Sequence, residues 1–178
     1  MELLLGAGSS REKKVSLPES PDWNKLVTLD INEDHAPDVV HDLTKFPYPF
    51  EDDTFDEVHA YEVLEHTGRQ GDYEFFFKQW EELWRILKPD GFFCGTCPDL
   101  TSRWVWGDPG HTRVIAPESF IFLNQPQYEM QVGKTPMTDY RFIYKADFEP
   151  LHLETQGETF VFVLKAMKPS RYVNGKTA

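Results

Sequence analysis

The chain has 178 residues, the size of one ordinary domain, and its 30 Asp and Glu residues outnumber its 18 Lys and Arg residues. The resulting formal charge of -12 repels phosphate backbones, so we expect no intact nucleic acid as a partner. The sequence shows neither an apolar run of membrane-spanning length nor a secretory leader, which predicts a cytoplasmic protein that does not associate with membranes.

The amino-terminal stretch joins a buried-strand pattern to a glycine turn. Leu3, Leu4 and Leu5 form a continuous apolar run, which is typical of a central parallel strand covered on both faces. Gly6 and Gly8 follow directly, and small residues at the carboxyl end of a strand let a ligand approach the backbone closely. The sequence therefore predicts that the chain starts inside its binding site.

Residues 9–25 lack the helix that usually follows such a turn. Pro18 and Pro21 interrupt the segment, which has no sustained helical period. Residues 26–29 predict a second strand that ends at Asp30. A carboxylate at this place can accept two hydrogen bonds from a ribose diol. A strand-end turn or a helix cap is an equally good interpretation of Asp30 from its position alone.

The middle of the chain alternates strands with a helix. We predict strands over residues 37–40, 55–61 and 91–97, and a helix that Asp72 caps at its start. The apolar stripe of this helix is expected to pack against the sheet rather than to contact a cofactor. That stripe consists of Phe76, Trp80, Leu83 and Leu87.

The last third of the chain opens with a long loop over residues 98–116, and a loop of that length in a compact domain is usually functional. Pro117 predicts the start of a short helix, and residues 125–140 show no strong period. Two final strands, residues 141–148 and 158–166, are expected to form an antiparallel hairpin.

This order of elements predicts an α/β fold with a mostly parallel sheet and a closing antiparallel strand pair. We expect a single domain over residues 1–167 and a polar, frayed tail over residues 168–178. Ligands bind such sheets at the carboxyl ends of the strands. The residues that fall at such ends are Gly6, Asp30, Asp42 and Tyr61.

Cys94 and Cys97 are the only cysteines, and their C-x-x-C spacing would form a redox pair in a thioredoxin-like context. Their neighbours instead predict a buried strand, and the sequence offers no second ligand pair for zinc. We therefore interpret both as buried, reduced thiols that pack as small apolar side chains, and we expect no metal site.

Six segments follow one another in a characteristic order over roughly residues 2–98. They are Leu4–Ser9, Leu29–Asn32, Asp38–Leu43, Phe46–Val58, Val63–His66 and Leu83–Gly91. Together they resemble the class I S-adenosylmethionine-dependent methyltransferases, in particular the methyltransferase-11-like group, and the combination is specific. The chain departs from the family in three ways: Ser10 replaces the usual third glycine, the first connecting helix is nearly absent, and no helix comes before the first strand.

The resemblance implies a Rossmann-like three-layer sandwich with a seven-stranded sheet, and it implies S-adenosylmethionine as the cofactor. Gly6 and Gly8 would pass under the methionine part of that cofactor. The cofactor-binding residues that the resemblance implies are Gly6, Ala7, Gly8, Ser9, Asp30, Ile31, Asp42, Leu43, Tyr61, Glu62 and His66.

The implied roles follow the cofactor along its length. Asp42 and Leu43 frame the adenine and Asp30 binds the ribose. Tyr61 and Glu62 lie beside the sulfonium. A rim of carboxylates suits this positively charged group. The rim consists of Asp30, Asp42, Glu62 and Glu65.

Methyl transfer is an in-line displacement, so holding the acceptor about 3 Å from the methyl group supplies most of the catalysis. A general base helps when the acceptor must lose a proton. His111, in the long loop, is our first candidate, followed by His66 and Asp99. A loop histidine that only packs is an equally good interpretation of His111, and a structural turn residue is a better one for His66.

The long loop also contains Trp104, Trp106 and Arg113, which either shape an acceptor site or form a lid that excludes water. Its end, Gly110–Phe120, is similar to a Gly-His-x-Arg loop in short methyltransferases that are often found with sugar-modifying enzymes.

The predicted function is methyl transfer to a small acceptor: a sugar, a nucleotide or another metabolite. The alternative is an interaction module that binds the cofactor without turnover. A nicotinamide-dependent oxidoreductase is disfavoured because Arg11 stands where its fingerprint needs a glycine. The thinly covered face of the sheet leads us to hypothesise a homodimer.

Overall fold

The computed structural model describes residues 1–172, and its centre is one seven-stranded sheet in the order β3-β2-β1-β4-β5-β7-β6. β1 to β5 run parallel, whereas β7 is antiparallel to both β5 and β6. This arrangement confirms the predicted Rossmann-like α/β fold. The strands are β1 (Glu2–Leu5), β2 (Leu26–Asp30), β3 (Val39–Val40), β4 (Phe55–Tyr61), β5 (Leu87–Pro98), β6 (Phe148–Gln156) and β7 (Thr159–Ala166).

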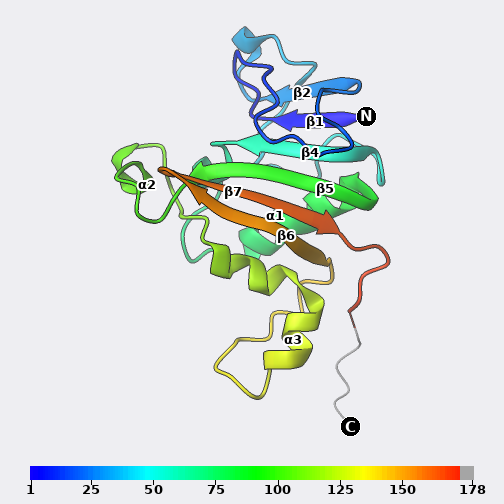
Figure 1. Cartoon of the computed structure of the whole chain (residues 1–178), viewed down its shortest axis with the longest axis vertical. Coiled ribbons are helices and arrows are strands. Elements are labelled where there is room, and N and C mark those ends of the chain that lie inside the picture. The colour runs from blue at the N-terminus through cyan, green and yellow to red at the C-terminus, as the bar shows by residue number, and fades with distance from the viewer. Residues whose placement is uncertain (173–178) are drawn as a thin grey trace.

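β1 lies between β2 and β4 and is the strand beside which the order of the sheet reverses. Leu3, Leu4 and Leu5 are all buried, as the apolar run predicted. The carboxyl ends of β1, β2 and β4 point to the same edge of the sheet (Figure 1). In open α/β sheets this reversal leaves a crevice for a ligand at that edge.

One face of the sheet is covered by α1 (Tyr73–Ile86), which lies behind the strands in Figure 1. The Asp72 side chain accepts a hydrogen bond of 3.0 Å from the backbone N–H of Phe75, which confirms the predicted cap. Trp80 and Leu83 are fully buried in the main core. Phe77, rather than Phe76, is the more deeply buried aromatic of the first turns.

The opposite face of β1 and β4 is covered by an irregular segment. None of the described residues from 6 to 25 is helical, as the two prolines predicted. Val15 and Leu17 pack there against Cys94 and Val163 in a small second core. The segment therefore replaces the missing helix with a few apolar contacts.

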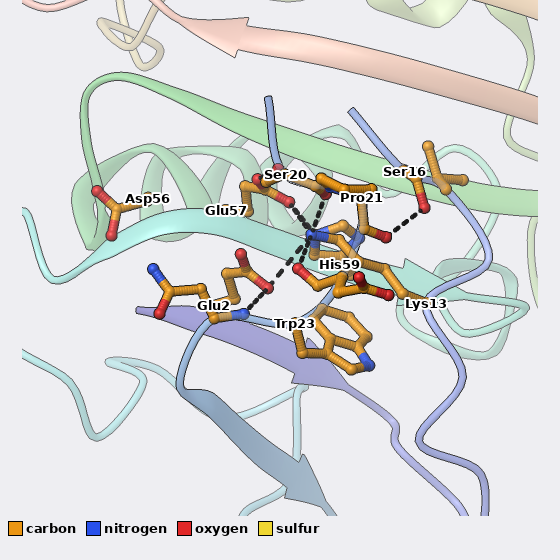
Figure 2. A network of polar contacts seen from close by, with 12 residues as sticks. Glu2, Lys13, Ser16, Ser20, Pro21, Trp23, Asp56, Glu57 and His59 are labelled. Atoms are coloured by element: carbon orange, nitrogen blue, oxygen red, sulfur yellow. Dashed lines mark hydrogen bonds and ion pairs between the residues drawn. The ribbon is translucent and has the colours of Figure 1, made fainter. Parts of the chain in front are cut away.

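A buried ion-pair network anchors this segment (Figure 2). The Nζ atom of Lys13 lies 2.9 Å from Glu57 Oε2 and 3.3 Å from Glu2 Oε2, and all three side chains are buried. Lys13 also donates a hydrogen bond of 2.9 Å to the carbonyl of Ser20. His59 lies on the same face, with Nε2 2.8 Å from Glu57 Oε2. The sequence analysis did not anticipate this network.

The chain between β5 and β6 holds more helix than predicted. The long loop contains a short helix, α2 (Trp104–Gly107), at the edge where the parallel strands end (Figure 1). Pro117 starts the expected short helix, η3 (Pro117–Leu123), which is a 3-10 helix. α3 (Gln125–Gln131) was not predicted, although Asn124 caps it by accepting a hydrogen bond of 3.2 Å from Gln127 N. Two further 3-10 helices are η1 (Glu33–His35) and η2 (Leu64–His66).

The prediction of a strand over residues 141–148 was wrong, because β6 begins at Phe148 and extends to Gln156. β6 is the edge strand of the sheet and most of its side chains are exposed, so it lacks the alternation that marks a half-buried strand. Tyr144 and Ala146 are buried without forming a strand, which explains the apolar pattern that misled the prediction.

Cys94 and Cys97 are buried free thiols, as predicted. Cys94 belongs to the small core and Cys97 to the main one, so the two sulfur atoms lie on opposite faces of β5. Within the described part of the chain, no helix combines the length and apolar character that crossing a bilayer requires.

The predicted tail is anchored at its start rather than frayed. Lys168 donates a hydrogen bond of 3.1 Å to the carbonyl of Arg85, and Arg171 Nε donates one of 2.6 Å to the buried Asp147. The remainder of that tail, residues 173–178, lies outside the described residues.

Candidate functional site

A hollow of about 650 Å³ opens at the carboxyl ends of β1, β2 and β4, and we call it the β1 hollow. Its volume is typical of small-molecule sites. Most of the cofactor-binding residues that the sequence predicted contribute to its wall. The lining residues are Gly6, Gly8, Leu29, Asp30, Ile31, His35, His41, Asp42, Leu43, Thr44, Glu62, Val63, His66 and Thr67.

Two glycines shape the floor of the β1 hollow. Gly6 has φ +56°, and a Cβ atom there would lie 2.5 Å from Cγ2 of Val63. Gly8 has φ +53°, and a Cβ atom there would meet no other atom within 4 Å. Gly6 is thus required by both its backbone conformation and the contact with Val63, whereas Gly8 leaves open space beside the backbone.

Asp30 ties the glycine turn to the end of β2. Its carboxylate accepts hydrogen bonds of 2.7 Å from Gly8 N and 2.8 Å from Asn32 N. Burial favours the neutral acid, but these two bonds and the nearby His35 outweigh it and lower the pKa of Asp30. Asp30 is therefore ionised at neutral pH, and its remaining lone pairs are available to a ligand.

Ile31, Asp42 and Leu43 also line the β1 hollow. Asp42 accepts hydrogen bonds from the backbone N–H and the hydroxyl of Thr44, and these bonds lower the pKa of its carboxyl group. The sequence analysis assigned no role to several other lining residues. His41 and Val63 stand inside the resembling segments, and His35, Thr44 and Thr67 lie outside them.

Tyr61 does not contribute its side chain to the β1 hollow. Its hydroxyl lies 2.6 Å from Nδ1 of His59 and accepts a hydrogen bond of 3.2 Å from Val15 N, on the face covered by residues 9–25. The side chain of Tyr61 therefore points away from the β1 hollow, and a contact between Tyr61 and the sulfonium stays a prediction. Ala7 and Ser9 belong to the glycine turn but not to the wall of the hollow.

Glu62 and His66 stand at the boundary of the β1 hollow. Glu62 has φ +56°, a conformation that a residue with a side chain rarely adopts. Its backbone N–H donates a hydrogen bond of 2.9 Å to the carbonyl of Thr96, which holds this conformation at the end of β4. Strain of this kind is often found at functional sites.

A second hollow of about 350 Å³, the β5 hollow, lies on the other side of Glu62 and His66. It is formed largely by the long loop after β5 and by the turn that starts β7. Its lining residues are Glu62, His66, Pro98, Ser102, Trp104, Asp108, His111, Glu158 and Thr159. Glu62 and His66 thus separate two adjoining hollows.

His111 reaches this boundary because the long loop is fastened to η2. The N–H of Thr112 donates a hydrogen bond of 2.9 Å to the carbonyl of Glu65. Arg113 is buried, donates a bond of 2.9 Å from Nε to the carbonyl of Leu64, and also bonds Thr67 and Gln79.

Arg113 therefore anchors the loop, and it is not among the residues that line the β5 hollow. Its burial lowers the pKa of the guanidinium to about 10. Trp104 lines the β5 hollow, whereas Trp106 is exposed and is not among the lining residues.

Both carboxylate oxygens of Asp99 accept hydrogen bonds from threonine hydroxyls. One accepts a hydrogen bond of 2.6 Å from the Thr101 hydroxyl, and the other accepts one of 2.7 Å from the Thr155 hydroxyl. These bonds lower the pKa of Asp99 and join the end of β5 to β6. Asp99 therefore has a structural role, and its role as a base stays a prediction.

Glu65 is a buried carboxyl group beside His111. Its Oε1 lies 3.9 Å from His111 Nε2, and among the described residues neither of its oxygens has a hydrogen-bond partner. Burial raises the pKa of Glu65 to about 8. The ring of His111 meets that of His66 edge to face, with the centroids 4.6 Å apart.

Residues 8–95 match the family model described as a methyltransferase domain, Methyltransf_11. No curated protein sequence aligns significantly with the chain.

Solved structures share the fold at low sequence identity. A S-adenosylmethionine-dependent methyltransferase from Archaeoglobus fulgidus is 16% identical, with a TM-score of 0.55 over 92% of this chain and 85% of that one. A putative methyltransferase from Haloferax volcanii, solved with the Trm112 methyltransferase activator, is 15% identical, with a TM-score of 0.57 over 93% and 82% of the two chains. A S-adenosylmethionine-dependent methyltransferase from Mesorhizobium loti is 13% identical, with a TM-score of 0.51 over 92% and 89%.

The sheet order, the glycine turn and the hollow beside it define a class I methyltransferase fold. With the match over residues 8–95, the chain is identified as a class I S-adenosylmethionine-dependent methyltransferase domain of the methyltransferase-11-like group. S-adenosylmethionine is the cofactor of this class.

The β1 hollow fits that cofactor on its own chemistry. It combines the open backbone at Gly8 with the ionised Asp30 and further carboxylates on its wall. These groups suit a ligand that carries a diol and a positive charge.

Proposed function

We propose that the protein transfers a methyl group from S-adenosylmethionine to a small acceptor bound in the β5 hollow. The observation that carries the proposal is that Glu62 and His66 line both hollows, so the two ligands would meet across them. Contact between donor and acceptor is the main geometric need of methyl transfer.

In this proposal Asp30 binds the ribose, Asp42 and Leu43 flank the base, and Glu62 faces the sulfonium. When bound, the cofactor supplies a methyl group that bonds to an acceptor atom while the carbon–sulfur bond breaks and sulfur keeps the electron pair. The carboxylates of the wall favour the positive charge of the donor over an anionic competitor.

The walls of the β5 hollow narrow the class of acceptor. Trp104 offers a flat apolar surface, whereas Glu62, Asp108 and Glu158 offer carboxylates. Carboxylates accept hydrogen bonds from hydroxyl and amino groups but repel phosphate. A sugar or an amine without phosphate is therefore favoured over a nucleotide.

The proton that such an acceptor loses is taken up by the chain's own imidazoles. His66 lines both hollows and His111 lines the second, and a neutral imidazole can act as the base. We assign the role of general base to His66 rather than to His111, because His66 lines both hollows.

The test is calorimetric titration of S-adenosylmethionine, followed by a transfer assay over a panel of sugars and amines. We expect micromolar cofactor binding by the wild type and transfer that falls at least tenfold in His66→Gln. His152→Gln is the matched control, because His152 is exposed and lines neither hollow, and it should leave both properties unchanged. Cofactor binding without transfer to any acceptor would favour the interaction module, and absence of cofactor binding by the folded protein would refute the proposal.

A further inference from the structure

We infer that Glu65, His66 and His111 form a binding site for one divalent transition-metal cation at the boundary of the two hollows. Each of the three side chains offers a ligand atom, and these atoms all lie within 4.8 Å of one another. The residues come from two segments far apart in sequence, η2 and the loop after β5, which the hydrogen bonds of Thr112 and Arg113 fasten together.

Glu65 supplies the independent indication of a ligand. Its side chain is only 2% exposed, and within the described part of the chain both carboxylate oxygens lack a hydrogen-bond partner. A buried carboxyl group without partners is costly, so native proteins nearly always provide it with one. A cation between Glu65 and the two imidazoles would satisfy it.

The ligand set selects the kind of ion. Two imidazoles with one carboxylate suit Zn²⁺, Co²⁺ and related ions, whereas Mg²⁺ and Ca²⁺ prefer sites made of oxygen atoms. Metal–ligand bonds of about 2.1 Å require ligand atoms roughly 3.4 Å apart in a tetrahedral site. Because His66 is exposed, its ring can turn toward Glu65 and His111 to close the present separation.

The charge around the site favours a cation. Glu62 lies next to Glu65 and interacts with it, and it lines both hollows. Asp108, on the wall of the β5 hollow, lies close to the position of His66, because a Cβ atom on Gly110 would contact both side chains. Two further carboxylates therefore surround the three ligands.

A similar cluster elsewhere in the molecule already contains a cation of the protein itself, the ammonium group of Lys13. Glu57, His59 and Cys94 also bring their ligand atoms within 4.8 Å, but the ammonium of Lys13 already lies 2.9 Å from Glu57. His59 there contacts Glu57 and Tyr61 through its two ring nitrogens. That cluster is internally satisfied, and Figure 2 shows Lys13 at its centre.

The site has a consequence for the reaction that rests on the proposed function. His66 and His111 both line the β5 hollow, so an ion held by them would have coordination positions open toward the acceptor. A hydroxyl group bound to such an ion loses its proton more readily than a free one. The acceptor would then be bound and activated by the ion itself, and His66, once it is a ligand of the ion, would no longer serve as the general base.

The experiment is a titration of the metal-free protein with Co²⁺, followed by visible absorbance, and a parallel calorimetric titration with Zn²⁺. Glu65→Gln and His111→Gln each remove one ligand with little change of shape. The matched control is His152→Gln, because His152 forms an exposed pair with Glu154, 3.3 Å apart. Circular dichroism and thermal unfolding of the metal-free protein establish that each variant is folded.

We expect one ion per chain in the wild type and in His152→Gln, with a Co²⁺ absorption band typical of imidazole and carboxylate ligands. The affinity for the metal ion should fall at least tenfold in Glu65→Gln and in His111→Gln. At the same concentration, Zn²⁺ should raise the melting temperature of the wild type and of His152→Gln more than that of the two ligand variants.

Several results would overturn the site: no stoichiometric binding by the wild type, unchanged affinity in either ligand variant, or loss of binding in His152→Gln. The titration needs neither cofactor nor acceptor, so its failure is distinct from a failure of methyl transfer. Metal binding without any transfer activity would support the site and leave the proposed function to its own test.

Discussion

The rings of His66 and His111 meet edge to face with their centroids 4.6 Å apart, although one follows β4 and the other lies in the loop after β5. Gly110 permits this approach, because a Cβ atom there would lie 3.0 Å from Nδ1 of His66. The pair stands where the β1 and β5 hollows adjoin. The position of His111 relative to His66 therefore depends on how the long loop is held against η2.

Replacing Asp30 should weaken cofactor binding. In Asp30→Asn the negative charge is lost and the amide cannot accept both backbone hydrogen bonds that the carboxylate accepts now. We expect the dissociation constant of S-adenosylmethionine, measured by calorimetry, to rise about 10- to 100-fold. Asp38→Asn is the control, because Asp38 is bonded to Thr28 away from the hollow. Equal affinity in the two variants would contradict this role of Asp30.

The two glycines of the turn should differ in their tolerance of alanine. Gly6→Ala adds a Cβ atom 2.5 Å from Val63 to a backbone with φ +56°, which should lower the free energy of unfolding by about 2 to 4 kcal/mol. Gly8→Ala has only the positive φ to oppose it and should cost about 1 kcal/mol. Denaturant unfolding measures both, and Val63→Ala added to Gly6→Ala should restore part of the loss. Equal costs at the two positions would refute the argument.

Removing the buried ammonium of Lys13 should destabilise the domain. Lys13→Met leaves the buried carboxylates of Glu2 and Glu57 without their cation, and breaking a buried pair in this way costs about 3 to 5 kcal/mol. Urea unfolding of the wild type and of Lys13→Met should show this difference in the free energy of unfolding. Lys14→Met is the neighbouring control and should change stability by less than about 0.5 kcal/mol, because Lys14 is exposed. A similar result for both lysines would show that the network is not needed for stability.

The same network predicts a dependence of stability on pH. Burial opposes ionisation of Glu57, but hydrogen bonds from His59, Ser20 and Lys13 outweigh it and lower its pKa from 4.5 to about 2. Because the folded pKa lies below the unfolded one, this contribution is fully present above pH 4.5 and is lost as pH falls toward 2. The difference in unfolding free energy between wild type and Glu57→Gln should therefore shrink over this range. A constant difference from pH 6 to pH 3 would exclude a titrating Glu57 as the cause.

The two cysteines should be inert in the native protein. Burial raises the pKa of both thiols, and the sulfur atoms lie on opposite faces of β5. A chromogenic disulfide reagent should label neither thiol in buffer and both in guanidinium. Rapid labelling of the native protein, or an intramolecular disulfide under mild oxidation, would contradict the arrangement.

The local sequence pattern was sufficient to predict those structural features that depend only on neighbouring residues in the chain. The buried run Leu3–Leu5, the cap at Asp72 and the missing helix over residues 9–25 follow from apolar content, hydrogen-bonding capacity and proline, and the structure has all three. The predicted strands placed Asp30 and Asp42 at strand ends, and both line the β1 hollow. These properties need no knowledge of what packs against the segment.

Features that depend on distant partners were missed or misjudged. The edge strand β6 carries no alternation, because the side chains on both of its faces are largely exposed. The buried Lys13 and Arg113 look like surface residues in a sequence, since nothing local shows the carboxylates or carbonyls that receive them. The hypothesis of a homodimer stays a prediction.

By itself, the sequence determined the class of fold through the order of its strands and helix, and it indicated the cofactor through its resemblance to a family. Both depend on short segments whose residues act through their own backbone and their immediate neighbours. Only the tertiary structure decided which acidic and histidine side chains meet. It turned Tyr61 and Asp99 away from the hollows, and it brought His111 to His66 and Glu65. The physical reason is that a side chain's role depends on the groups within a few ångströms of it, and here those groups come from the far end of a loop.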